Sequence, residues 1–142
     1  MSSIRFTQKY AIKSNVSYDE FKIHKYVYHL GIVNMPRIVS YDESSKVMKM
    51  QRIYGSSVAD FYGENIVDIP SSILTSISNI LKKLTSNNIE YPDITGYNFM
   101  LDEDTNEIWI IDFEHAKYKE GTTNEFILKS CEKIDRWNPE FM

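Results

Sequence analysis

Cysteine is almost absent from this sequence, since Cys131 is the only one. An intramolecular disulfide and a cysteine metal cluster are therefore excluded, which favours a reducing, intracellular compartment. The 16 Lys and Arg against 20 Asp and Glu leave a net charge of −4, which gives no overall attraction for nucleic acid. No run approaches the ~20 apolar residues of a membrane span, and residues 1–10 lack the apolar core of a signal peptide. We expect a cytoplasmic protein that binds neither nucleic acid nor membranes.

Glycine and proline are also scarce, with five and four copies that are scattered as turn residues rather than gathered in a linker or repeat. What is present is the composition of a soluble globular protein, with 42% hydrophobic and 25% charged residues. The length of 142 residues allows one compact domain or two small lobes with a modest core.

The first part of the chain has strand-like runs on either side of one helical segment. A strand-like segment lies within residues 4–13, and apolar runs bounded by turn residues predict strands at 37–41 and 47–53. Apolar residues at helical spacing predict a helix over residues 17–30. These elements predict a small antiparallel sheet with one helix packed on it.

The pattern changes at the Gly-Ser-Ser sequence of residues 55–57, after which the composition favours helix. Apolar stripes predict a helix over residues 68–85 and a last helix over 124–134, whose cysteine faces the core. We therefore divide the chain into a first lobe, residues 1–54, and a short, mainly helical second lobe, residues 55–142. The fold class predicted is α+β.

A β-hairpin is predicted inside the second lobe. Apolar runs at 99–101 and 108–111 flank a polar turn, so Asn98 precedes the first strand and Asp112 follows the second. In an antiparallel pair these positions lie at the same edge, and Asp93 lies just upstream of them. Carboxylate and amide oxygens at one edge suit Mg²⁺, which prefers oxygen ligands.

Lys13 and Glu20 each allow two interpretations. Lys13 is either a solvated residue at a strand end or a side chain on the same face as Ala11. Glu20 lies at the edge of the buried stripe of its helix, so its carboxylate needs a partner. That partner is either a backbone N–H in a capping box that begins at Ser17, or Lys13. The spacing alone does not decide between them.

Four motifs, in this order, resemble those of the protein-kinase-like fold. They are the end of the VAIK strand at Ala11-Ile12-Lys13, the helix glutamate at Glu20, the DxxxxN catalytic loop from Asp93 to Asn98, and the DFG motif at Asp112-Phe113-Glu114. Residues 20–38 and 52–63 are similar to casein-kinase-type and small atypical kinases. The resemblance covers residues 8–118 and implies a reduced two-lobed kinase fold.

The resemblance also implies a site for ATP and Mg²⁺. Lys13 would hold the α- and β-phosphates and be oriented by Glu20, while Asn98 and Asp112 would hold Mg²⁺. Asp93 would accept or orient the hydroxyl proton of the substrate.

The same resemblance places the connection between the lobes at residues 50–54. Backbone groups of Arg52 and Tyr54 would then be available to adenine. Because backbone contacts tolerate unusual side chains, this assignment depends on position rather than on residue type.

Three departures from the family pattern bear on the expected activity. With 12 residues before Lys13 and no GxGxxG sequence, we expect the glycine-rich loop and its two strands to be missing. Tyr91-Pro92 replaces the His-Arg before the catalytic aspartate, which argues against regulation by an activation-loop phosphate. No APE motif follows Asp112, so a peptide-docking segment and most of the large lobe are also expected to be missing.

Three functions follow as hypotheses. The first is a minimal, atypical Mg-ATP-dependent phosphotransferase that acts on Ser or Thr of a protein substrate. The second is a kinase-like binding module, or pseudokinase, that regulates a partner protein. The third is a small-molecule kinase, which the Asp-Phe-Glu sequence suggests. In each case, apolar surface on the reduced first lobe predicts a homodimer that covers it.

Overall fold

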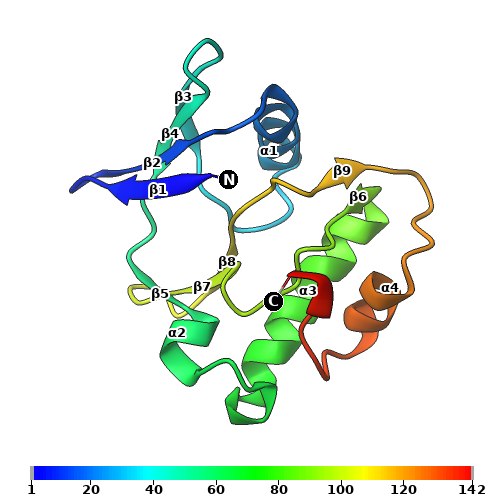
Figure 1. The fold of residues 1–142 in the computed structure, drawn as a ribbon. Helices are drawn as coiled ribbons and strands as arrows, with labels where there is room; N and C mark the ends of the chain where they lie inside the picture. Colours follow the sequence, from blue (N-terminus) through cyan, green and yellow to red (C-terminus); the bar gives the residue numbers. More distant parts are fainter. Residues whose placement is uncertain (1, 142) are drawn as a thin grey trace.

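The structure is a computed structural model that describes residues 2–141 (Figure 1). The first part of the chain forms β1 (Ser3–Phe6), β2 (Tyr10–Ser14), α1 (Tyr18–Leu30), β3 (Ile38–Asp42) and β4 (Val47–Gln51). The chain continues through β5 (Gly55–Ser57), α2 (Val58–Tyr62), the short 3-10 helix η1 (Ile66–Asp68) and α3 (Ser71–Ser86). The last part contains β6 (Ile89–Glu90), β7 (Phe99–Asp102), β8 (Ile108–Ile110), β9 (Lys117–Tyr118), α4 (Glu125–Glu132) and η2 (Pro139–Phe141).

The four-stranded sheet has the strand order β1-β2-β4-β3, and each neighbouring pair is antiparallel. Side chains alternate along β2, so that Ala11 and Lys13 face the buried side. They lie opposite Met50 and Met48 of β4, which are buried on the same face. Lys13 is therefore buried, with 2% of its surface exposed, and the interpretation of a solvated lysine is wrong.

Residues 4–13 contain two strands where the sequence predicted one. β1 and β2 are joined by a tight turn, in which the Tyr10 N–H donates to the Thr7 hydroxyl at 3.0 Å. All four residues of β1 are exposed, so this strand has no buried face that an apolar–polar alternation would reveal.

Helix α1 has the boundaries that the sequence predicted. The Ser17 hydroxyl accepts a hydrogen bond from the Glu20 backbone N–H at 3.1 Å, and Gly31 ends the helix in the left-handed conformation, with φ of 64°. The Phe21 ring stacks on Tyr41 of β3 with 4.4 Å between ring centroids. This contact fixes α1 against the four-stranded sheet.

The two later long helices pack on each other and begin slightly differently from the prediction. Helix α3 begins at Ser71 rather than at residue 68, because Pro70 occupies the position before the first turn. Helix α4 follows Asn124, whose side-chain oxygen accepts from the Ile127 N–H at 3.1 Å, and it ends at Glu132. The cysteine of α4 is buried, as expected of a core residue.

The predicted hairpin is present as β7 and β8, with Phe99 opposite Ile110. Together with β5 these strands form a three-stranded sheet. Further along, β9 pairs with β6 and places Lys117 opposite Glu90. β6 lies just before Asp93 in the sequence. Its pairing with β9 therefore brings the segment that follows the hairpin close to Asp93.

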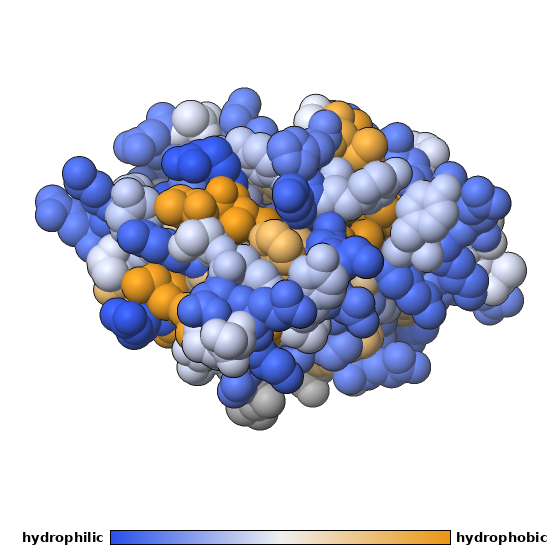
Figure 2. Space-filling view, turned by 90° about the horizontal axis from the view of Figure 1, so that it is seen from above, coloured by the Kyte–Doolittle hydropathy of each residue, from blue (hydrophilic) through white to orange (hydrophobic). Residues whose placement is uncertain are grey.

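The buried apolar side chains form two clusters. The smaller one lies in the four-stranded sheet, and the larger one connects Ile23 and Val27 of α1 to the helices and hairpin of the second part. On the face shown in Figure 2, apolar side chains reach the surface in separate patches among hydrophilic ones. Within residues 2–141, no helix has both the length and the apolar content that crossing a bilayer requires.

Candidate functional site

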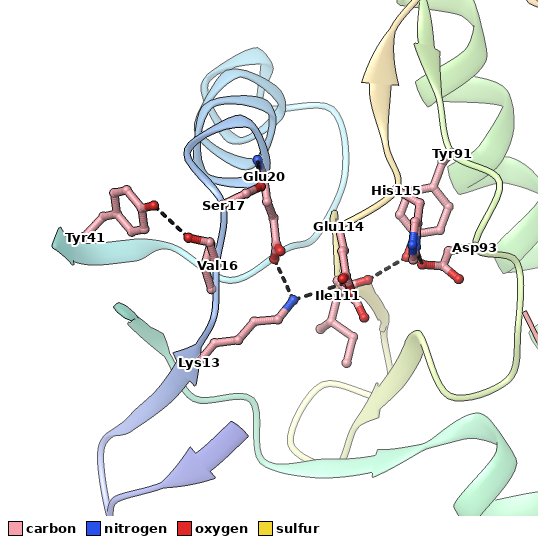
Figure 3. Close-up of polar contacts among 11 residues, drawn as sticks. Lys13, Val16, Ser17, Glu20, Tyr41, Tyr91, Asp93, Ile111, Glu114 and His115 are labelled. Carbon is pink, nitrogen blue, oxygen red and sulfur yellow. Dashed lines mark hydrogen bonds and ion pairs between the residues drawn. The ribbon is translucent and has the colours of Figure 1, made fainter. Parts of the chain in front are cut away.

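Lys13 lies at the centre of a buried ion network (Figure 3). Its Nζ atom is 2.5 Å from Glu20 Oε2 and 3.2 Å from Asp112 Oδ1, and Lys13 and Glu20 are each only 2% exposed. Ser17 caps the helix through the backbone of Glu20, while the Glu20 carboxylate turns to Lys13. The structure thus brings together β2, α1 and the segment after the hairpin at one ammonium group.

The electrostatics of this network keep Lys13 charged. Burial alone favours the neutral amine, but the carboxylates of Asp112 and Glu20 outweigh it and raise the pKa of Lys13 above its ordinary value. Glu20 Oε1 is buried without a hydrogen-bond partner among the described residues. Buried oxygens of this kind normally have a hydrogen-bond partner.

Asp112 is held in an unusual backbone conformation beside Lys13. Its φ of 65° is in the left-handed region, which non-glycine residues rarely adopt, and its Oδ1 atom also accepts from the Glu114 N–H at 3.1 Å. Both contacts use Oδ1. The second carboxylate oxygen of Asp112 is left for another partner.

Asn98 is oriented by two hydrogen bonds at the start of the hairpin. Its Nδ2 donates to the Asp93 carbonyl oxygen at 2.9 Å, and its own carbonyl oxygen accepts from the Ile111 N–H at 3.0 Å. Within residues 2–141, the side-chain amide oxygen Oδ1 has no hydrogen-bond partner. Asn98 and Asp112 therefore each offer one oxygen, as a site for Mg²⁺ with phosphate and water ligands requires. Residues 2–141 contain no cluster of three or more His, Cys, Asp and Glu side chains that would enclose a metal by itself.

Asp93 is 6% exposed, and its carboxylate contacts a residue that the sequence analysis did not single out. The Asp93 Oδ2 atom lies 2.8 Å from His115 Nδ1 (Figure 3). Burial raises the pKa of the Asp93 carboxyl, against the opposing effect of this hydrogen bond. The position of His115 depends on the pairing of β6 with β9, which consists of two residues in each strand and leaves almost no pattern in the sequence.

An apolar cavity of about 220 Å³ opens beside the ion network. Its walls include Lys13, Glu20, Asn98 and Asp112 together with apolar side chains from both parts of the chain, namely Ile4, Ala11, Met48, Met50, Ile53, Met100 and Ile111. The cavity thus joins a largely apolar interior to a polar side that carries the ammonium group and the two candidate metal ligands.

Arg52 and Tyr54 are not among the residues that line this cavity, and the assignment of their backbone groups to adenine stays a prediction. From their segment the lining residues are Gln51 and Ile53, because side chains alternate along an extended chain. The Tyr54 carbonyl oxygen accepts from the Glu103 N–H at 3.1 Å, so this backbone group already has a partner.

The order of the elements and the buried Lys–Glu pair define a fold like that of protein kinases. The solved structure of the kinase PK-1 from Cydia pomonella granulovirus is similar, with a TM-score of 0.58 and 14% sequence identity. The match covers 82% of this chain and 48% of that one, so this chain spans about half the length of the kinase. No protein-family model and no curated protein sequence matches the chain. The likeness therefore concerns the fold.

Proposed function

We propose that this protein is a Mg-ATP-dependent phosphotransferase whose acceptor is a Ser or Thr hydroxyl group of another protein. The observation that carries the proposal is the Lys13 ammonium, held between Glu20 and Asp112 at the wall of the cavity. Buried ion pairs contribute little net stability compared with apolar side chains of similar volume. A binding role for a polyanion explains this arrangement better than a role in stability.

Each residue of the site has a task under this proposal. The cavity would take the adenine base, since its volume of about 220 Å³ is less than the ~300–1,000 Å³ of pockets that enclose larger ligands. Lys13 would bind phosphate oxygens, and Asn98 and Asp112 would hold Mg²⁺. Bound Mg-ATP would supply the phosphoryl group and neutralise its charge. Asp93 would orient the acceptor hydroxyl and take its proton, which typically contributes about 10²- to 10⁴-fold.

A protein substrate is favoured over a small molecule by the surface beside Asp93. A groove of about 770 Å³ runs between α1 and the segment of residues 114–118, and it is open rather than enclosed. An open groove admits an extended segment of chain, whereas small molecules usually bind in enclosed pockets.

A kinase-like binding module is the second candidate, and one observation favours it. The five glycines lie at positions 31, 55, 63, 96 and 121, so the β1–β2 turn, residues 7–9, contains none. Within residues 2–141 there is consequently no glycine-rich loop whose backbone N–H groups would cover the phosphates. Absence of phosphoryl transfer, with or without nucleotide binding, would be the result expected of this candidate.

Thermal unfolding with Mg-ATP, Mg-ADP or no nucleotide tests the proposal. A ligand at one hundred times its Kd stabilises the folded state by about 2.7 kcal/mol, so we expect a clear rise in Tm. Asp112→Asn should remove the part of the shift that depends on Mg²⁺. Asp104→Asn, which changes an exposed aspartate in the β7–β8 turn, is the matched control and should keep the full shift.

Phosphoryl transfer from labelled ATP to a mixture of Ser and Thr peptides is the second measurement. We expect transfer by the wild type and a loss of about 10²-fold or more in Asp93→Asn. Absence of any Tm shift at millimolar nucleotide would overturn the phosphotransferase and leave the kinase-like binding module. A shift without transfer would select the binding module.

A further inference from the structure

His115 and Asp93 form a contact that lies outside the phosphate and metal positions described above. His115 is three residues beyond Asp112, and its Nδ1 atom lies 2.8 Å from Asp93 Oδ2. The imidazole also contacts Phe141 of η2, whose ring centroid is 4.9 Å from its own. The ring is therefore fixed by a hydrogen bond at one edge and by an aromatic contact.

His115 is the side chain that fixes the Asp93 carboxylate. The other polar contacts of Asp93 involve its backbone carbonyl oxygen, which accepts from Asn98 Nδ2 and from the Thr95 N–H. Within residues 2–141, the carboxylate has no hydrogen-bond partner besides His115, and its Oδ1 atom has none. Asp93 thus uses one oxygen to hold its orientation and keeps the other for a reactant.

We propose that His115 is a positioning residue, which holds the Asp93 carboxylate with Oδ1 directed to the acceptor hydroxyl of the substrate. The inference rests on the proposed phosphotransferase function and adds to it a residue with a defined task. When Oδ1 takes the hydroxyl proton, the imidazole at Oδ2 keeps the carboxylate from rotating. An imidazolium at this position also favours the ionised carboxylate, which is the form that accepts the proton.

The electrostatic surroundings of His115 agree with a charged pair. Burial lowers the pKa of the imidazole, but the hydrogen bond and the charge of Asp93 outweigh it and raise the pKa above its ordinary value. Other charged or titratable groups also surround the ring, namely Asp19, Lys22 and Tyr26 of α1, Asp112 and Glu114 before it, and Lys117 and Tyr118 of β9. These groups carry charges of both signs. Among them and Asp93, it is Asp93 that forms the hydrogen bond to the imidazole.

The contact is tested without any assay of activity by NMR titration of ¹⁵N-labelled histidine. The chain has three histidines, and the signal of His115 is identified by its loss in His115→Asn. We expect the pKa of His115 to fall when Asp93 is changed to Asn, since the charge that raises it is removed. An unchanged titration in Asp93→Asn would show that the two side chains are not paired, and would overturn the inference.

The positioning role is tested by kinetics at saturating Mg-ATP. We expect His115→Ala to lower kcat by about ten- to hundredfold, the usual effect of losing a residue that orients a functional group, with little change in KM for ATP. His115→Asn keeps a neutral donor near the position of Nδ1 and should recover most of kcat while flattening the pH profile. His29→Ala removes an exposed histidine of α1 and serves as the control.

Two outcomes would overturn this inference alone, and a third would overturn it together with the proposed function. Equal or higher kcat in His115→Ala would mean that the imidazole is dispensable or obstructs Asp93, and either result overturns the inference alone. A failure of His115→Asn to recover kcat would also count against a positioning hydrogen bond. A wild type that binds nucleotide but transfers no phosphate would overturn the proposed function and the positioning role together, whatever the NMR titration shows.

Discussion

His24 lies on α1 at the wall of the cavity, where its Nε2 is 2.7 Å from the Pro36 carbonyl oxygen. The side chain is buried, and burial lowers the pKa of His24 to about 4, from an ordinary value of 6.5. The folded protein therefore holds a neutral imidazole at pH values where the unfolded chain binds a proton. His24 is thus a buried helix residue whose imidazole has a hydrogen-bond partner.

From the lowered pKa of His24 we expect the folded state to lose stability in acid. The contribution of His24 is fully present above pH 6.5 and is lost as the pH falls toward about 4. Between pH 7 and pH 5 we expect a loss on the order of 2 kcal/mol, at about 1.4 kcal/mol for each pH unit. Urea unfolding at both pH values measures it. His24→Asn should reduce the pH dependence, whereas exposed His29→Asn should not; equal slopes in all three proteins would contradict the prediction.

At the scale of residues, the sequence was a better guide to which polar residues belong to the site than to which side chains they contact. Lys13, Glu20 and Asp112 were each identified by residue type and spacing, and the structure brings their side chains into contact. His115 was not, because its partner Asp93 is 22 residues away and neither strand that aligns them has a hydrophobic period. The assignment of the Arg52 backbone to adenine stays a prediction, since spacing does not show to which side an extended segment turns.

At the scale of elements, the loop between β6 and β7, which carries Asp93, is held by the chain that precedes η2. Asn138 is 4% exposed, its Nδ2 donates to the Pro92 carbonyl oxygen at 2.7 Å, and its backbone N–H donates to the Ile94 carbonyl oxygen at 2.9 Å. The Trp137 ring packs so closely on Gly96 that an added Cβ would lie 3.2 Å from it. The terminal segment therefore supports the loop that carries Asp93.

Asn138→Ala is expected to loosen this loop. A buried carbonyl oxygen left without its donor costs about 1–3 kcal/mol, and hydrogen exchange of residues 93–98 should become faster. Asn87→Ala is the matched control, because Asn87 Nδ2 donates to the Lys83 carbonyl oxygen at 2.8 Å on an exposed surface. Faster exchange confined to distant helices, or none at all, would show that the terminal segment does not support the loop.

Element boundaries were predictable where an apolar stripe was long. Helix α1, helix α3 and the β7–β8 hairpin have several buried residues at the expected period. In contrast, β1 is exposed throughout, α2 has five residues, and β9 has two, so none of them provides a period to recognise. Their positions follow from tertiary contacts, which local sequence does not encode.

At the scale of the whole molecule, β1 is an edge strand with exposed apolar side chains. Ile4 is 44% exposed and Phe6 is 56% exposed, and the outer edge of β1 has no partner strand within residues 2–141. Unpaired edges invite pairing with another chain. The expectation of a homodimer from the sequence remains a proposal, for which this edge is the surface.

Light scattering coupled to size exclusion tests the dimer at micromolar concentration. We expect a mass of twice 16.7 kDa for the wild type and a shift to monomer in Phe6→Ser. Phe61→Ser on α2 removes a phenylalanine that is 61% exposed and should leave the dimer intact. A wild-type mass of one chain across the concentration range would exclude self-association through β1.

The Arg52 guanidinium contacts the hairpin formed by β1 and β2. Its carbon Cζ lies 5.0 Å from the centre of the Phe6 ring and 4.9 Å from that of Tyr54, and Nη1 donates to the Thr7 carbonyl oxygen at 2.7 Å. The Tyr54 hydroxyl donates to the Gln8 carbonyl oxygen as well. These contacts hold the tip of the β1–β2 hairpin against residues 52–54, which follow β4. Movement of the hairpin tip away from the segment after β4 would therefore break these hydrogen bonds and ring contacts.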